Sequence, residues 1–205
     1  QGLIDDLVGH FGKDFQTKVI PTGYDPSLYM PGGEKKRLVL SVCNAQDRKG
    51  LVKGIDIFAE CARRMPDVPF RLIGVTGEAM KELGIVPENL EVIGEIPSEE
   101  VIHHYQEAKV YCQLSMREGL PNAVCEAMLC ECSVVGSDVQ GVRTAVDVHG
   151  FLVPYGDVAR TCEAIRKALT FDGSKGRMYI MKNFSEERRR SSLTALIESI
   201  CKEDG

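Results

Sequence analysis

Six short apolar segments constrain the fold more than any other feature of this chain. Each is rich in branched aliphatic residues and apolar at successive positions, without alternation between apolar and polar residues. Strands of this kind are typical of a sheet that is covered on both faces, as parallel sheets are. The predicted strands lie at residues 38–42, 70–74, 90–94, 110–114, 133–136 and 151–153.

Longer segments with helical patterns separate these strands, at residues 51–65, 76–83, 98–107 and 121–131. Repeated strand–helix units predict an α/β fold with a doubly wound, Rossmann-like parallel sheet and right-handed crossovers. Ligands of such sheets bind at the carboxyl ends of the strands. The tail differs, because residues 157–170, 174–183 and 185–201 predict three consecutive helices without strands.

Composition excludes several classes of function. The net charge of -5 leaves no excess of Lys and Arg to neutralise phosphates, so broad nucleic-acid binding is not expected. No apolar run reaches the length of a transmembrane segment, and the N-terminus does not resemble a signal peptide. At 205 residues the chain fits one large domain with a tail.

The eight cysteines lie singly in apolar runs, apart from Cys130 and Cys132. There is no C-x-x-C pair and no histidine at a metal-ligand spacing, since His103 and His104 fall in a predicted helix and are expected at the surface. We therefore expect buried, reduced thiols, no metal and a cytoplasmic protein.

The segment SMREGLPNAVCEAM, at residues 115–128, is the most informative for function. Glu118 follows the predicted strand 110–114, so it falls at the carboxyl edge of the sheet. Pro121 can open a helix, whose first amides and positive dipole end favour a phosphate. Glu118 and Glu126 would repel a phosphate unless they face hydrogen-bond donors such as sugar hydroxyls. The segment therefore suggests a nucleotide-sugar, although two glutamates eight residues apart are also common as solvated surface residues.

This segment and the CSVVGSDVQGV that follows it at residues 132–142 resemble the donor-site signature of glycosyltransferase family 4. These are retaining glycosyltransferases of the two-domain GT-B fold, with the pattern S-x-x-E-G-x-P/G-x-x-x-x-E-A-M. VIPTGYD, at residues 19–25, resembles the segment that precedes the donor domain in that family. The resemblance covers nearly the whole chain after residue 17.

The resemblance implies a role for several residues around a nucleotide-sugar donor. Glu118 is expected to contact hydroxyls of the donor sugar and to act in catalysis, and Glu126 is expected to bind the ribose. Ile96 is a candidate contact to the base, although a core isoleucine explains it equally well. Close backbone approach and free amides would come from Gly119, Leu120, Pro121 and Asn122.

The family's G-R-x-x-x-x-K-G segment, which holds the donor diphosphate, aligns with residues 43–50. Lys49 supplies the lysine, which the resemblance makes a diphosphate-binding and catalytic residue, while Asn44 stands where the family has arginine. An amide cannot form a charged bidentate pair, so this change would weaken diphosphate binding by about 1–3 kcal/mol unless Arg48 turns inward. A solvated Lys49 is the alternative.

Other departures concern small residues. Glu131 and Ser133 replace a glycine and a proline of the family pattern, and the glycine-containing turn at residues 140–144 loses one glycine and a glutamate. These changes leave the predicted fold intact and bear on the identity of the donor and on activity.

The resemblance implies three regions: residues 1–17 as a remnant of a preceding domain, 18–184 as the nucleotide-sugar-binding domain, and 185–205 as a helix that packs toward a missing N-terminal domain. That domain would carry the family's catalytic-site histidine, bind the sugar or lipid-linked acceptor and provide any attachment to a membrane. The chain is thus expected to be the donor half of a glycosyltransferase, inactive alone and independent of metal, since no D-x-D sequence is present. An epimerase or phosphorylase of the same fold, or a non-catalytic nucleotide-sugar-binding domain, is the alternative.

Overall fold

One six-stranded parallel sheet forms the centre of the molecule, with the strand order β3-β2-β1-β4-β5-β6. The computed structural model describes residues 9–10, 18–43, 50–82, 84 and 86–203. The order reverses between β1 and β4, which places a topological switch point at the middle of the sheet. The strands are β1 (Lys36–Val42), β2 (Phe70–Ile73), β3 (Leu90–Ile93), β4 (Ala108–Gln113), β5 (Ser133–Ser137) and β6 (Gly150–Val153).

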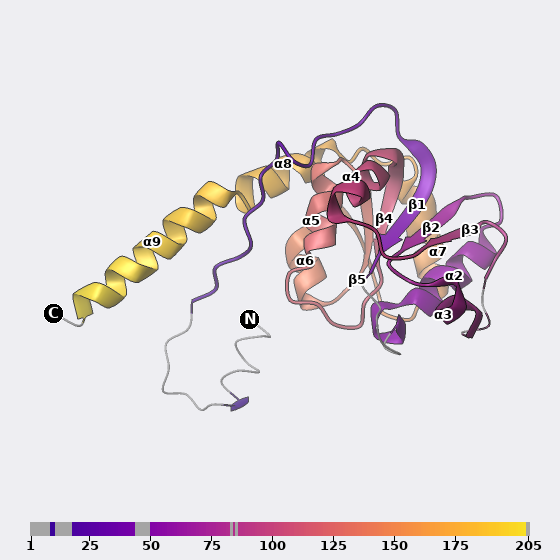
Figure 1. Ribbon diagram of the computed structural model, residues 1–205, viewed down its shortest axis with the longest axis horizontal. Coiled ribbons are helices and arrows are strands. Elements are labelled where there is room, and N and C mark those ends of the chain that lie inside the picture. The colour runs from indigo at the N-terminus through magenta and orange to yellow at the C-terminus, as the bar shows by residue number, and fades with distance from the viewer. Residues whose placement is uncertain (1–8, 11–17, 44–49, 83, 85, 204–205) are drawn as a thin grey trace.

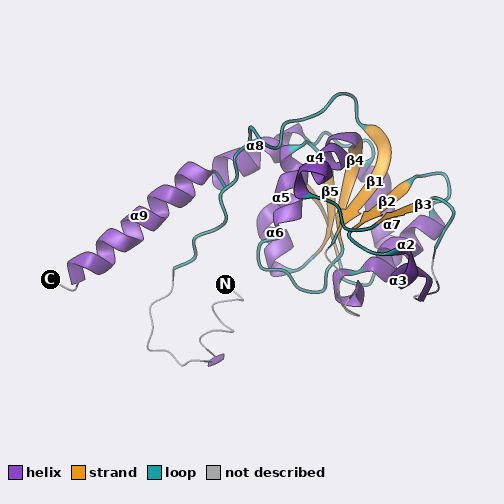
Figure 2. Ribbon diagram, in the orientation of Figure 1, coloured by secondary structure: helices purple, strands orange, loops and turns teal. Residues whose placement is uncertain are grey.

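Helices cover both faces of this sheet, as Figures 1 and 2 show. One face packs against α2 (Ile55–Arg64), α3 (Gly77–Glu82) and α7 (Val158–Ala168). The other face packs against α4 (Ser98–Glu107), α5 (Asn122–Leu129), α6 (Gln140–Val146) and α8 (Ser174–Asn183). The 3-10 helix η1 (Gly50–Lys53) precedes α2, and α9 (Glu186–Glu203) continues from α8 and extends away from the sheet (Figure 1).

Successive strand residues are buried in opposite layers, which explains the apolar segments of the sequence. Val39 and Leu40 are both fully buried, the first in the layer under α2 and α7 and the second in the layer under α4 and α5. The aromatic residues are divided in the same way. Phe58 and Phe70 meet edge to face on the first side, and Tyr105 and Tyr111 on the second.

The predicted fold class is confirmed, and all six predicted strands are present. The three helices of the tail also form, as α7, α8 and α9. Two details differ. The predicted helix 51–65 is interrupted at Gly54, which has a φ of 72° and separates η1 from α2. Residues 140–146 form α6 where only a turn was expected; this short helix has no side-chain cap at Val139 and contains a glycine, so it lacks the usual sequence signals.

All eight cysteines are free thiols. Six of them are buried, as expected, and burial raises the pKa of Cys43 to about 11 and that of Cys125 to about 12. Cys162 is partly exposed and Cys201 is exposed, so the expectation of buried thiols was wrong for these two. Cys201 lies on α9, where the described residues provide no layer to cover it.

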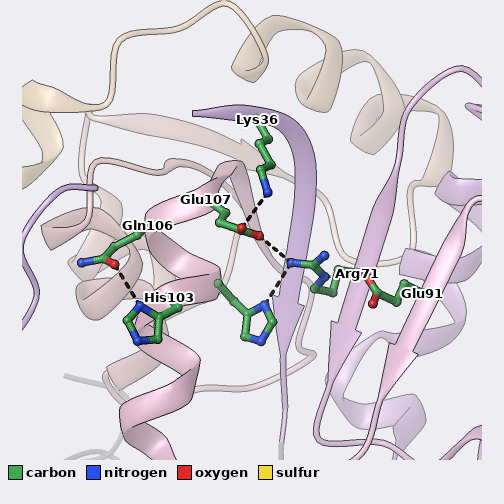
Figure 3. Close-up of polar contacts among 7 residues, drawn as sticks. Lys36, Arg71, Glu91, His103, Gln106 and Glu107 are labelled. Carbon is green, nitrogen blue, oxygen red and sulfur yellow. Dashed lines mark hydrogen bonds and ion pairs between the residues drawn. The ribbon is translucent and has the colours of Figure 1, made fainter. Parts of the chain in front are cut away.

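A charged network ties the edge of the sheet to α4 (Figure 3). The guanidinium of Arg71, on β2, donates to Glu91 Oε2 at 2.6 Å, to Glu107 Oε2 at 3.0 Å and to His104 Nδ1 at 3.0 Å. Glu107 also pairs with Lys36, at 2.6 Å. Because the guanidinium can only donate, His104 accepts this bond with an unprotonated Nδ1. His103 is exposed, as predicted, whereas His104 is partly buried in the network.

We predict that His104 makes folding stability depend on pH. Burial and the adjacent Arg71 lower the pKa of His104 below its ordinary value of 6.5. The unfolded chain therefore binds a proton more readily, so this contribution to stability is complete above pH 6.5 and is lost as the pH falls below it. Chemical denaturation at pH 7.5 and 5.5 should show a smaller pH-dependent loss for His104→Gln than for the wild type. His103→Gln is the matched control, and a His104→Gln variant that follows the wild type would contradict the prediction.

Candidate functional site

Glu118 lies in the loop after β4, at the carboxyl edge of the sheet and beside the switch point between β1 and β4. Its side chain is 13% exposed and pairs with Lys53, whose Nζ lies 2.8 Å from Glu118 Oε1. The amide of Gln113 donates to the same oxygen, at 3.0 Å. A cation and a carboxylate thus meet where a sheet of this type binds its ligands.

Buried polar residues fix the orientation of Glu118. The Tyr111 hydroxyl donates to Gln113 Oε1 at 2.9 Å, and Gln113 Nε2 donates to Ser115 Oγ at 2.8 Å as well as to Glu118. Tyr111 and Ser115 are fully buried and Gln113 nearly so. Buried networks whose members are satisfied hold their geometry strongly. The sequence signal for this network was a glutamine at the end of an otherwise apolar strand, which our sequence reasoning did not use.

Lys53 is a second residue that sequence reasoning missed. Lys49 and Asn44, the residues predicted to hold the diphosphate, lie outside the described residues. Lys49 was favoured because it was expected just before a helix. Helix η1 begins at Gly50, directly after Lys49, and Lys53 ends η1 two residues before α2 begins at Ile55, so both lysines precede a helix start. The role of Lys49 stays a prediction. The available signal was a repeated Lys-Gly pair, since Lys53-Gly54 follows Lys49-Gly50 by four residues.

Gly54 brings Lys53 to the loop after β4. Its φ of 72° is in the left-handed region, and a Cβ atom there would collide with the carbonyl oxygen of Leu114. A hydrogen bond of 2.8 Å from Met116 N to Val52 O joins the same two segments. The side chain of Lys53 is held near Glu118 by this contact and remains 36% exposed, so a ligand can reach it.

Gly141 plays a corresponding role on the other side of the loop. It lies in the first turn of α6, and a Cβ atom there would collide with the carbonyl oxygens of Glu118 and Gly119. Residues 140–144 were predicted as a turn that retains one family glycine. The structure shows that this glycine packs directly on the backbone of the predicted donor-site loop.

The start of α5 supplies free backbone amides. Pro121 is the N-cap, and the amides of Val124 and Cys125 already donate to its carbonyl oxygen. The amides of Asn122 and Ala123 precede these bonds, as is usual at the start of a helix. Asn122 is exposed and its Oδ1 accepts a hydrogen bond of 2.8 Å from the Tyr24 hydroxyl.

Glu126, one turn further along α5, has a different environment. The Tyr105 hydroxyl donates to Glu126 Oε2 at 3.2 Å. The Tyr29 phenol also lies near this carboxylate and acts on its pKa through hydrogen bonding. Burial raises the pKa of the Glu126 carboxyl above its ordinary value, and the two hydrogen bonds oppose that rise. Tyr111 lies within electrostatic range of both Glu118 and Glu126.

The remaining predicted residues lie beyond the carboxyl ends of β4 and β3. Gly119 and Asn122 are exposed, Pro121 is buried, and Leu120 is partly buried against the α5 side of the core. Ile96, in the loop between β3 and α4, also packs partly buried against that layer. Its packing role is therefore visible, and its contact to a base stays a prediction.

A hollow lies at the opposite edge of the sheet from Glu118, where the strands begin. Basic residues line this hollow, but it does not suit the predicted diphosphate site, because Arg37 and Arg166 both pair with Asp67. It also borders the C-terminal end of α7, where free carbonyl groups disfavour anions. It is lined by Glu34, Lys35, Arg37, Lys109, Arg166, Leu169 and Thr170.

Within the described parts of the chain, no group of three or more His, Cys, Asp and Glu side chains is arranged to hold a metal ion. The same residues contain no helix that is both long and apolar enough to cross a membrane.

Comparison with known proteins identifies the family. The model of the family described as glycosyl transferases group 1 matches residues 31–186, most of the chain. The chain belongs to this family. A curated relative, an uncharacterized glycosyltransferase of Haemophilus influenzae, is 26% identical over 202 residues, which are 93% of this chain and 55% of the relative.

Solved structures confirm the predicted GT-B type of Rossmann-like fold. Sucrose-phosphate synthase from Thermosynechococcus elongatus aligns with a TM-score of 0.80 at 22% identity, over 98% of this chain and 57% of that protein. Anabaena Alr3699/HepE in complex with UDP-glucose aligns with a TM-score of 0.78 at 19% identity, over 95% and 61%. The chain therefore spans little more than half the length of these two proteins and of the curated relative.

We predict that Gly54→Ala destabilises the protein by about 1–3 kcal/mol, because a side chain at this left-handed position is strained and collides with the Leu114 carbonyl. Gly77→Ala is the matched control: Gly77 begins α3, and a Cβ atom there meets nothing within 4 Å. We expect the control to be neutral or slightly stabilising. Equilibrium denaturation measures both, and equal effects would show that the Gly54–Leu114 contact is not required.

We also predict that Glu126→Gln stabilises the ligand-free protein at pH 8. The raised pKa of the buried carboxyl means that its ionised form destabilises the folded state above that pKa. Removal of the charge relieves this cost, and the gain diminishes as the pH falls through the raised folded-state pKa and vanishes below 4.5, where the carboxyl is protonated in both states. Thermal unfolding of both proteins between pH 4.5 and 8 tests the prediction, and a pH-independent difference would refute it.

Proposed function

We propose that this chain binds the donor, a nucleoside diphosphate sugar, for a retaining glycosyltransferase that moves the sugar to an acceptor. The observation that carries the proposal is the Lys53–Glu118 pair, at 2.8 Å, beside the start of α5 and at the switch point of the sheet. A lysine and free helix amides suit a diphosphate, and a carboxylate suits sugar hydroxyls. The retaining outcome is supported by the resemblance of residues 115–128 to the family signature.

In the ligand-free site, Lys53 and Glu118 neutralise one another. We assign to Lys53 the role that the resemblance gave to Lys49. When a donor binds, Lys53 would turn to the diphosphate and Glu118 would accept hydrogen bonds from the sugar. Cleavage of the bond between sugar and phosphate then places negative charge on the leaving diphosphate. Lys53 and the α5 amides would stabilise that charge at positions fixed before the reaction.

The remaining predicted groups complete the donor site. Glu126 would bind the ribose and Ile96 would border the base, while Gly119, Leu120, Pro121 and Asn122 would allow close approach of backbone to the sugar and phosphates. Uridine diphosphate is the natural first probe, because solved structures of Anabaena Alr3699/HepE contain UDP or UDP-glucose. The acceptor would be bound mainly by a second domain, which is consistent with the greater length of the relatives.

Binding of UDP to the chain tests this proposal. Lys53→Ala should weaken UDP binding about tenfold or more, since a hydrogen bond to a charged group contributes roughly 1.5–3 kcal/mol. The affinity of this variant for uridine, which lacks the diphosphate, should change little. Calorimetric titration of both ligands measures the difference, with Lys182→Ala on α8 as a control for the loss of an exposed lysine.

Two results would contradict the proposal. Equal losses for UDP and uridine in Lys53→Ala would place this lysine away from the diphosphate. An absence of UDP binding to the folded wild type would remove the donor-binding role itself. A parallel titration with a chelator tests the proposal that no divalent metal is needed, and a loss of binding on chelation would refute that part.

A further inference from the structure

A segment that precedes the sheet, residues 24–30, lies across α5 next to the proposed ribose site; we call it the strap. The strap meets both functional parts of α5. The Tyr24 hydroxyl donates to Asn122 Oδ1 at the start of this helix, and the Tyr29 phenol lies near the carboxylate of Glu126 in the next turn. Two side chains of the strap therefore reach residues of the proposed donor site.

We infer that Tyr29 of the strap and Tyr105 of α4 are positioning residues for Glu126, which hold its carboxylate oriented and charged as the acceptor for the ribose of the donor. This inference rests on the proposed function and deepens it. It assigns a role to two tyrosines that the sequence motif does not include.

The backbone of the strap is fastened to the body of the domain, so the position of Tyr29 is defined. Tyr24 N donates to Phe184 O at 2.8 Å. Arg177, on α8, donates to Tyr29 O at 2.7 Å and also to the carbonyl of Leu129 at the end of α5. The side chain amide of Gln106, on α4, donates to the carbonyl of Met30 at 3.0 Å. Residues of α4 and α8, and Phe184 directly after α8, therefore hold the backbone of the strap on either side of Tyr29.

Tyr105 is fixed even more firmly. Its side chain is 1% exposed and packs edge to face against Tyr111, with ring centroids 5.7 Å apart. Its hydroxyl reaches Glu126 Oε2 at 3.2 Å. Glu126 thus receives a hydrogen bond from a rigid core residue and lies near a phenol of the strap.

These two contacts leave room for a ribose. An ionised carboxylate has about four lone-pair positions, and the two phenols use at most two of them. The remaining positions can accept the two hydroxyls of a ribose. A protonated carboxyl would offer fewer acceptors and would add a donor, so ribose binding requires the charged form.

The phenols also favour that charged form. Burial raises the pKa of Glu126, and the hydrogen bonds from Tyr105 and Tyr29 lower it. The neighbouring titratable groups stay neutral near pH 7, since burial raises their pKa values, to about 12 for Tyr29 and Cys125. Since the Glu126 pKa is raised above its ordinary value, Glu126 is the member of this cluster that gains a proton first as the pH falls below neutral. The neighbouring groups are Tyr24, Tyr29, Tyr105, Tyr111, Cys125 and Cys130.

The test compares UDP binding at pH 6 and pH 8 for Tyr29→Phe, Tyr105→Phe and the double variant, using the full chain. Each Kd is divided by the wild-type Kd at the same pH, which cancels the titration of the ligand itself. We expect the double variant to lose more UDP affinity at pH 6 than at pH 8, by up to about tenfold for each unit by which the substitutions raise the Glu126 pKa, because such a rise reduces the charged fraction most at low pH.

Two controls make the result specific. Tyr179→Phe removes a phenol hydroxyl from the same side of the sheet, where it donates to Thr144 O at 3.1 Å, and should not alter the pH profile. In a Glu126→Gln background, where no carboxyl can titrate, the two Tyr→Phe changes should have no pH-dependent effect. If Tyr105→Phe fails to fold, the partly exposed Tyr29→Phe alone should still show a smaller loss that is confined to low pH.

The possible failures are distinguishable. UDP binding that weakens equally at both pH values, or does not change, would overturn the positioning role while leaving the proposed function intact. A wild-type chain that is folded and binds no UDP at either pH would overturn the proposed function and this inference together.

Discussion

The contact between Gly54 and the carbonyl of Leu114 determines much of the candidate site. It joins the segments that follow β1 and β4, the two strands on either side of the switch point. Lys53 is adjacent to this contact and reaches Glu118 because of it. On the other side, Gly141 packs on the carbonyls of Glu118 and Gly119. Two glycines, which allow close contact between backbone segments, thus hold the loop of the proposed donor site between η1 and α6.

The sheet was predictable because its physical requirement is local. A strand buried on both faces must be apolar at successive positions, and this pattern is visible in residues 38–42 or 110–114 without knowledge of their neighbours. Helix α6 was not predictable by the same means. Its seven residues carry no capping side chain and include Gly141, and the helix is stabilised by packing of Val142 and Ala145 in the core rather than by local preferences.

The residues of the candidate site also divide into those that a local pattern indicates and those that depend on tertiary contacts. Glu118 and Glu126 were predicted because the family signature places both in one continuous segment. Lys53 was not singled out because its approach to Glu118 depends on the tertiary contact of Gly54 with Leu114, which no local pattern shows. Tyr29 and Tyr105 lie 97 and 21 residues from Glu126 in the sequence. No local pattern could connect them with it, since their partnership arises only when the strap and α4 pack beside α5.

Arg177 has a consequence for where this domain can be cut. Its guanidinium is fastened to carbonyl groups of Pro26, Tyr29 and Leu129. The family model begins at residue 31, after the strap. A minimal domain trimmed to that boundary would keep every strand, yet it would leave this cation beside an uncovered α5 with most of its acceptors removed. These contacts therefore place the structural boundary of the domain upstream of residue 31, where the family model begins.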